Sequence, residues 1–134
     1  RFVEHIQELA ATLTPAPKLL PCDVQDDAQI DAVFADIAAT HGGLDFVVHG
    51  AAFAPRDEIT NPFTETSREG FRIALDVSAY SLIALARGAQ PLFEARGGGS
   101  IVTLSYLGAE RALAIELAKN VRGVKSVSTK GLVL

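Results

Sequence analysis

The sequence lacks methionine and tryptophan entirely, and it contains a single cysteine, Cys22. One cysteine cannot form an internal disulfide, which excludes a disulfide scaffold. The histidines show no metal-ligand spacing, so we expect no metal site. No apolar run is long enough to cross a bilayer, and the first residues begin an amphipathic pattern rather than a signal peptide. These absences predict a cytoplasmic protein without a membrane partner.

Positive charge is also sparse. Lys and Arg together number 12 against 16 Asp and Glu, which gives a formal net charge of −4. The basic residues are dispersed and form no stripe, so we expect no nucleic-acid partner. Apolar residues make up 49% and charged residues 21%, a balance typical of soluble globular chains rather than disordered tails. A chain of 134 residues is long enough for one domain with an ordinary core.

Hydrophobic periodicity predicts alternating helices and strands. The predicted helices cover residues 2–13, 27–41 and 68–93, the last interrupted near Gln90 and Pro91. The predicted strands cover residues 19–24, 44–49 and 100–105. Beyond Gly108 the pattern indicates a helix over 112–120 and a strand over 123–128, with 132–134 as a further strand candidate.

Local signals set several of these boundaries. Asp26 or Asp27 can cap the second helix, and His41-Gly42-Gly43 ends it. Residues 66–69 fit a capping box, and residues 52–66 before them read as a long irregular loop. The strand at 44–49 is mostly apolar rather than alternating, which is expected when both faces of a sheet are covered.

Strands separated by helices favour an α/β fold with a mostly parallel sheet. In such sheets ligands bind beyond the carboxyl ends of the strands. Three strand ends are therefore candidate site positions. They are Asp23, the run His49-Gly50-Ala51-Ala52, and the pair Ser105-Tyr106.

These strand ends carry a family resemblance. The segments that carry it are CDV at 22–24, LDFVVHGAAFAP at 44–55, REGF at 68–71 with DVSAYS at 76–81, and LSYLGAERA at 104–112. Together they resemble the short-chain dehydrogenase/reductase superfamily, and within it the NADH-dependent enoyl-acyl-carrier-protein reductases. The resemblance covers about residues 3–112. It implies an incomplete Rossmann-like parallel sheet with flanking helices, NADH as cofactor and reduction of an enoyl thioester in fatty acid synthesis.

The resemblance implies a set of cofactor-binding positions. Asp23 and Val24 match the residues that hold the adenine, and Gly50, Ala51 and Ala52 match a turn where the backbone approaches ribose and phosphate. Ser105, at the third strand end, belongs with them. Two plainer interpretations stay open. Asp23 can be the N-cap of the following helix, and the small residues can reflect tight packing of strand on helix.

The resemblance also implies a substrate side. Phe53 and Ala54 match the start of a loop that lines an acyl pocket, and Tyr106 matches a tyrosine near the thioester, where a phenol could donate to a developing enolate oxygen. Phe53 can equally be a core aromatic. Tyr106 can equally be a tyrosine whose ring packs against the protein and whose hydroxyl contacts water. Ser78 matches a polar position that organises this region. His49, at the end of a buried strand, reads as a satisfied core histidine.

The chain departs from the family in several places. Relatives open with a strand and a glycine-rich turn that holds pyrophosphate at a helix N-terminus, and this sequence has no such segment. It also lacks their second strand and the tyrosine and lysine that follow the motif at 104–112. No tyrosine follows Tyr106, so Lys119 receives no catalytic role.

The tail permits two interpretations. Residues 113–134 can supply a helix and a strand that complete the reductase domain of residues 1–112, or they can be a joined foreign piece. In the second case residues 111–127 resemble a BON module. The absent methionine and the abrupt start predict a piece of a longer protein or an engineered product.

Three functions are compatible with these residues and departures. One is an enoyl reductase whose partner is an acyl-carrier-protein thioester, with a homo-oligomer left open. The alternative is a truncated or chimeric α/β domain without catalytic activity. The third is an interaction module of BON type that acts at a lipid surface, which only the tail supports.

Overall fold

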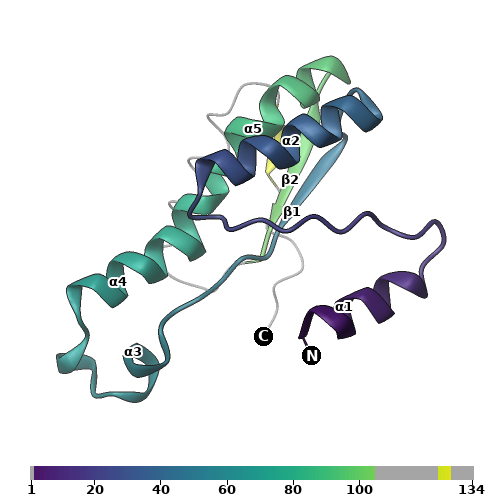
Figure 1. Cartoon of the computed structure of the whole chain (residues 1–134). Helices are drawn as coiled ribbons and strands as arrows, with labels where there is room; N and C mark the ends of the chain where they lie inside the picture. The colour runs from purple at the N-terminus through teal and green to yellow at the C-terminus, as the bar shows by residue number, and fades with distance from the viewer. Residues whose placement is uncertain (1, 105–123, 128–134) are drawn as a thin grey trace.

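The computed structural model describes residues 2–104 and 124–127 (Figure 1). The N-terminal half contains helix α1 (Phe2–Ala11), helix α2 (Asp27–His41) and strand β1 (Phe46–His49). Two short helices follow, α3 (Arg56–Thr60) and the 3-10 turn η1 (Phe63–Glu65). A long helical stretch comes next, made of α4 (Arg68–Leu75), the π-helical turn η2 (Asp76–Tyr80) and α5 (Ser81–Ala95). The remaining strands are β2 (Gly99–Thr103) and β3 (Val124–Val127).

The strands form one parallel sheet in the order β1-β2-β3. Between β1 and β2 the register pairs Phe46 with Ser100 and His49 with Thr103, so the two strands end side by side. Between β2 and β3, Gly99 pairs with Val124. The predicted α/β class with a parallel sheet is confirmed, and so is a strand within residues 123–128.

The core lies between the sheet and helices α2 and α5. Helix α5 contacts β1 and β2, and α2 packs on α5. The buried apolar residues of this cluster are Ile30, Phe34, Leu82, Ala84, Ala86, Ala89, Leu92, Phe93 and Ile101. Two glycines permit the close packing, because a Cβ at Gly88 would overlap the ring of Phe34 and a Cβ at Gly99 would overlap the ring of Phe93.

The ends of α2 follow the sequence signals. The carboxylate of Asp26 accepts hydrogen bonds from the backbone N–H groups of Ala28 and Gln29, so Asp26 is the N-cap. Gly42 ends the helix with a φ of 69°, a left-handed conformation that glycine adopts without a side-chain penalty.

The cap of α4 lies one residue later than the pattern predicts. Ser67 is the N-cap, and its Oγ accepts from the N–H of Gly70 at 2.9 Å. The carboxylate that accepts from the Ser67 N–H belongs to Glu58 of α3, at 2.9 Å, rather than to Glu69. Glu69 instead pairs with Arg72 at 2.7 Å.

Further predicted features are wrong. Residues 19–24 form no strand, and the side chains of Leu19 and Leu20 are exposed. Pro17 and Pro21 keep this segment extended, but each lacks an N–H, and the described sheet begins at β1, so no ladder forms beside the segment. The long helix also continues through Pro91 to Ala95, and its irregular turn is η2.

Another correction concerns residues 52–66. This stretch is not wholly irregular, because α3 and η1 lie within it. The expectation that both faces of the sheet are covered also fails in the described part of the chain. The helices cover the face that carries Val47 and His49, whereas Phe46 is 63% and Val48 57% exposed on the other face.

Several predicted features lie outside the described residues. They are the site positions Ser105 and Tyr106, the helix over 112–120 and the strand candidate at 132–134.

Candidate functional site

The carboxyl ends of β1 and β2 open at the same edge of the sheet. The N–H of Leu104 donates to the carbonyl of His49 at 2.9 Å, so the two strand ends stay paired up to their last residues. The chain leaves β1 through Gly50, Ala51 and Ala52, and these residues therefore lie beside the end of β2. This edge is where parallel α/β sheets bind ligands.

Gly50 lies open at this edge. Gly50 and Ala52 are exposed, and Ala51 is half-buried. A Cβ built on Gly50 would lie 3.4 Å from Cδ1 of Leu104, which is ordinary contact. Tight packing of strand on helix therefore does not account for Gly50, and the turn presents its backbone to solvent.

Asp23 begins a compact loop before α2. Its Oδ1 accepts from the N–H of Gln25 at 3.0 Å, and its own N–H donates to Oε1 of Gln29 at 2.9 Å. The side chain of Asp23 is exposed, while Val24 beside it is half-buried. Asp26 is the helix cap, so the interpretation of Asp23 as the N-cap is wrong.

Phe53 follows the turn and points outward. Its side chain is 53% exposed, so the interpretation as a core aromatic is wrong. Its backbone is held by Ser78 of η2, whose Oγ accepts from the N–H of Phe53 at 3.1 Å and donates to its carbonyl at 3.2 Å. Ala54, the next residue, is half-buried. These two hydrogen bonds join the Phe53 loop to η2, and the organising role that the resemblance implies for Ser78 stays a prediction.

His49 closes β1 as a buried, fully hydrogen-bonded side chain. Its Nε2 lies 2.8 Å from Oγ of Ser81, and its Nδ1 lies 3.0 Å from Oγ1 of Thr103. The hydroxyl of Ser81 donates to the carbonyl of Val77 at 2.6 Å, so its oxygen is left to accept from His49 Nε2–H. In the neutral ring, Nδ1 then accepts from the Thr103 hydroxyl.

The buried position favours the neutral form of the His49 ring. Burial lowers the pKa of His49 below its usual value, because a charged imidazolium loses hydration in the core. The prediction of a satisfied core histidine is confirmed. His49 therefore has a structural role at the end of β1 and does not take part in ligand binding at the carboxyl edge.

One side-chain contact at the carboxyl edge of the sheet could not be predicted from the sequence. Nε2 of Gln25 donates to Oδ2 of Asp76 at 3.0 Å, which joins the Asp23 loop to η2 across 51 positions. The same turn η2 also holds Phe53 through Ser78. Both loops that carry predicted site residues are therefore tied to one turn of helix.

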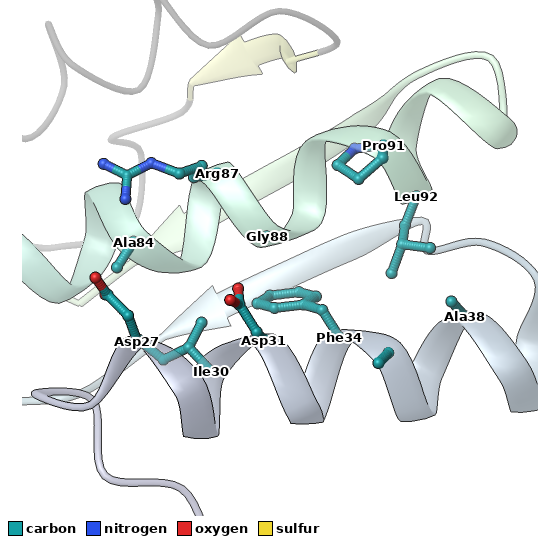
Figure 2. A pocket seen from close by; sticks show the side chains of 11 residues that line it. Asp27, Ile30, Asp31, Phe34, Ala38, Ala84, Arg87, Gly88, Pro91 and Leu92 are labelled. Carbon is teal, nitrogen blue, oxygen red and sulfur yellow. The ribbon is translucent and has the colours of Figure 1, made fainter.

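A cavity of about 500 Å³ lies elsewhere, between α2 and α5 (Figure 2). It is lined by Asp27, Ile30, Asp31, Phe34, Ala35, Ala38, Ala84, Arg87, Gly88, Pro91 and Leu92. None of the predicted site residues contributes to it. In the part of the chain that the structure describes, no cluster of His, Cys, Asp and Glu could hold a metal, and no helix is long and apolar enough to span a membrane.

A parallel sheet packed under helices, with small residues and a carboxylate loop near its carboxyl edge, defines a Rossmann-like α/β protein. Residues 1–125 match the family described as Enoyl-(Acyl carrier protein) reductase. The chain belongs to this family, which confirms the resemblance seen in the sequence.

Curated relatives are similar at high identity. The NADH enoyl-[acyl-carrier-protein] reductase FabI of Nostoc sp. is 47% identical over 113 residues, which are 84% of this chain and 43% of the relative. The FabI of Bacillus cereus is 41% identical over 134 residues, 99% of this chain and 50% of the relative. The chain thus spans about half the length of the curated relatives it matches.

Solved structures show the same fold. The enoyl-(acyl-carrier-protein) reductase from Anaplasma phagocytophilum, determined in complex with NAD, has a TM-score of 0.77 and 32% identity, and the match covers 89% of this chain and 50% of that one. The Bacillus cereus enoyl-acyl carrier protein reductase with NADP+ and an indole naphthyridinone has a TM-score of 0.72 and 41% identity. That match covers 88% of this chain and 46% of the other.

Proposed function

We propose that this protein takes part in NADH-dependent reduction of the double bond of an enoyl thioester carried by acyl carrier protein, a step of fatty acid synthesis. The single observation that carries the proposal is the shared attachment of two loops to η2. Gln25 brings the Asp23 loop to Asp76, and Phe53 is bound by Ser78. The names of the relatives support the same activity.

The residues at this edge fit a dinucleotide. The exposed carboxylate of Asp23 can accept from an adenine amine, and the half-buried Val24 offers an aliphatic surface for the ring. The exposed backbone at Gly50, Ala51 and Ala52 leaves room for ribose and phosphate, because no side chain larger than methyl stands there. We assign these five residues to cofactor binding.

When bound, NADH supplies the hydride that reduces the double bond. Phe53 and Ala54 form part of the wall that faces the acyl chain, and the two hydrogen bonds from Ser78 fix the backbone of Phe53 there. Tyr106, in the sequence just beyond β2, is assigned the donation of a hydrogen bond to the enolate oxygen. Ser105 is assigned to the cofactor side.

We further propose that residues 113–134 complete the same domain. The parallel pairing of β3 with β2 and the family match through residue 125 support this over a foreign BON-like piece. The single unpaired cysteine and the acidic balance are in keeping with a cytoplasmic location. A homo-oligomer is compatible with the apolar side chains on the open face of the sheet.

The experiment is a titration of NADH into the purified protein, followed by addition of an enoyl thioester of acyl carrier protein. We expect saturable NADH binding and thioester-dependent loss of NADH absorbance. A Gly50→Leu variant should bind NADH at least about tenfold more weakly, because its side chain fills the space left for the cofactor. A Leu13→Ala variant, at an exposed position near α1, is the control.

The two readouts separate the alternatives. NADH binding without turnover would support a cofactor-binding domain without catalytic activity, and would overturn the proposed reaction. Absence of NADH binding by a folded protein would overturn the proposed function as a whole.

A further inference from the structure

Gln25 and Asp76 form a bridge at the carboxyl edge of the sheet. Nε2 of Gln25 lies 3.0 Å from Oδ2 of Asp76, although the two residues are 51 positions apart. Gln25 lies in the loop before α2, and Asp76 is the first residue of η2. The side chain of Asp76 is only 26% exposed, so its carboxylate is held close to the protein surface.

The bridge continues directly to Asp23. The backbone N–H of Gln25 donates to Oδ1 of Asp23 at 3.0 Å, while its side chain donates to Asp76. One residue thus presents donors to two carboxylates. The Asp23 carboxylate is therefore linked to η2 through Gln25, whose backbone contacts Asp23 and whose side chain contacts Asp76.

Asp76 is a firm anchor for this bridge. Its Oδ2 also faces Nη1 of Arg72 at 3.5 Å. Arg72 is in turn held by both carboxylate oxygens of Glu69, at 2.7 and 3.0 Å. The anchor belongs to the long helical stretch that packs on the sheet, whereas the loop of Gln25 is exposed.

We infer that Gln25 and Asp76 are positioning residues that hold the Asp23–Val24 loop in the conformation required to bind the adenine half of the dinucleotide. The inference rests on the proposed function, and it assigns a specific role to two residues that do not themselves match any cofactor-binding position.

The expected change in NADH affinity follows from the fraction of molecules in which the Asp23–Val24 loop has the binding conformation. If the bridge is removed, the loop samples other conformations, and the apparent dissociation constant rises in inverse proportion to the fraction that stays competent. A hydrogen bond of this kind shifts such an equilibrium by a factor of about three to ten. The loss of affinity should occur for ligands that contain adenine and not for ligands that lack it.

The test compares NADH with reduced nicotinamide mononucleotide, which has no adenine. We expect Gln25→Ala and Asp76→Ala each to weaken NADH binding about threefold to tenfold. The binding of reduced nicotinamide mononucleotide should stay unchanged. The double variant should be no weaker than the worse single variant, because both changes remove the same hydrogen bond.

Two further variants separate positioning from general stability. Asp76→Asn keeps an oxygen that can accept from Gln25 but loses the ion pair with Arg72, so it should retain NADH affinity within about twofold. Gln25→Glu places a second carboxylate against Asp76 and should weaken NADH binding more than Gln25→Ala does. The matched control is Gln90→Ala, which removes another exposed amide-to-carboxylate bond, to Glu94 at 3.1 Å, within α5.

The outcomes are distinct. Unchanged NADH affinity in folded Gln25→Ala and Asp76→Ala would overturn the inference while leaving the proposed function in place. Equal weakening of both ligands would also overturn it, because the effect would then be structural. Failure of the unchanged protein to bind NADH would overturn the proposed function itself. Melting temperatures of all variants confirm that each is folded.

Discussion

His49 Nε2 lies 2.8 Å from Ser81 Oγ, and this hydrogen bond joins the end of β1 to the first turn of α5. Both side chains are almost fully buried, at 2% and 0% exposed. The bond belongs to a chain that runs from the Thr103 hydroxyl through His49 and Ser81 to the carbonyl of Val77. This chain of hydrogen bonds thus connects β1, β2 and the long helical stretch next to the candidate site.

Replacing Ser81 by alanine should destabilise the protein. The change removes the acceptor of His49 Nε2–H and leaves a buried donor without a partner, which costs about 1–3 kcal/mol. The free energy of unfolding in urea measures the effect. Ser100→Ala, at a half-buried position of β2, is the control and should change it by less than about 0.5 kcal/mol. Equal effects of the two changes would refute the importance of the buried chain.

His49 should also make stability depend on pH. Burial lowers its pKa in the folded state, so the unfolded chain binds a proton more readily as pH falls. The contribution of His49 is therefore complete above the usual histidine pKa and is lost as pH falls below it. Unfolding free energies at about pH 7.5 and about pH 5.5 should differ more for the unchanged protein than for a His49→Gln variant. An identical pH dependence in both would contradict the assignment of a neutral buried ring.

The cap of α4 gives a prediction that separates two neighbouring residues. Ser67→Ala should cost about 1 kcal/mol, because the N–H of Gly70 loses its acceptor and Glu58 loses a partner. Thr66→Ala should be nearly neutral, since the Thr66 hydroxyl bonds only to the carbonyl of Phe63. The melting temperatures of the Ser67→Ala and Thr66→Ala variants test this prediction. A larger loss of stability in Thr66→Ala than in Ser67→Ala would support the capping box expected from the sequence.

Close packing of α2 on α5 depends on Gly88. In an open helix, alanine would be more stable than glycine by about 1 kcal/mol. At Gly88 the added methyl group would overlap the ring of Phe34, so we expect Gly88→Ala to destabilise by about 1–3 kcal/mol. Phe34→Leu in the same chain should recover part of the loss, and denaturant unfolding would show it. Stabilisation by Gly88→Ala alone would contradict this packing.

The sequence predicted those features that depend on local chemistry. Asp26, one of the two predicted caps, and Gly42 bound α2, because a cap requires an acceptor at one end and a left-handed residue at the other. His49 was correctly placed in the core, because a histidine that ends an apolar strand must have its polar atoms satisfied. The parallel sheet followed from the alternation of helix and strand.

The failures share a different origin. Residues 19–24 have an apolar pattern, but a strand exists only if another strand lies beside it. The contacts of Glu58 with Ser67 and of Gln25 with Asp76 join residues 9 and 51 positions apart, and exposed polar side chains carry no periodic signal of such pairing. The cap of α4 was displaced by one residue because Thr66 and Ser67 are both suitable caps.

The cofactor site at the carboxyl edge is tested most directly by following backbone amide signals by nuclear magnetic resonance while NADH is added. We expect saturable shifts concentrated at Asp23, Val24, Gly50, Ala51 and Ala52. Shifts concentrated in the cavity between α2 and α5, or no shifts at saturating NADH, would contradict the assignment of the carboxyl edge as the cofactor site.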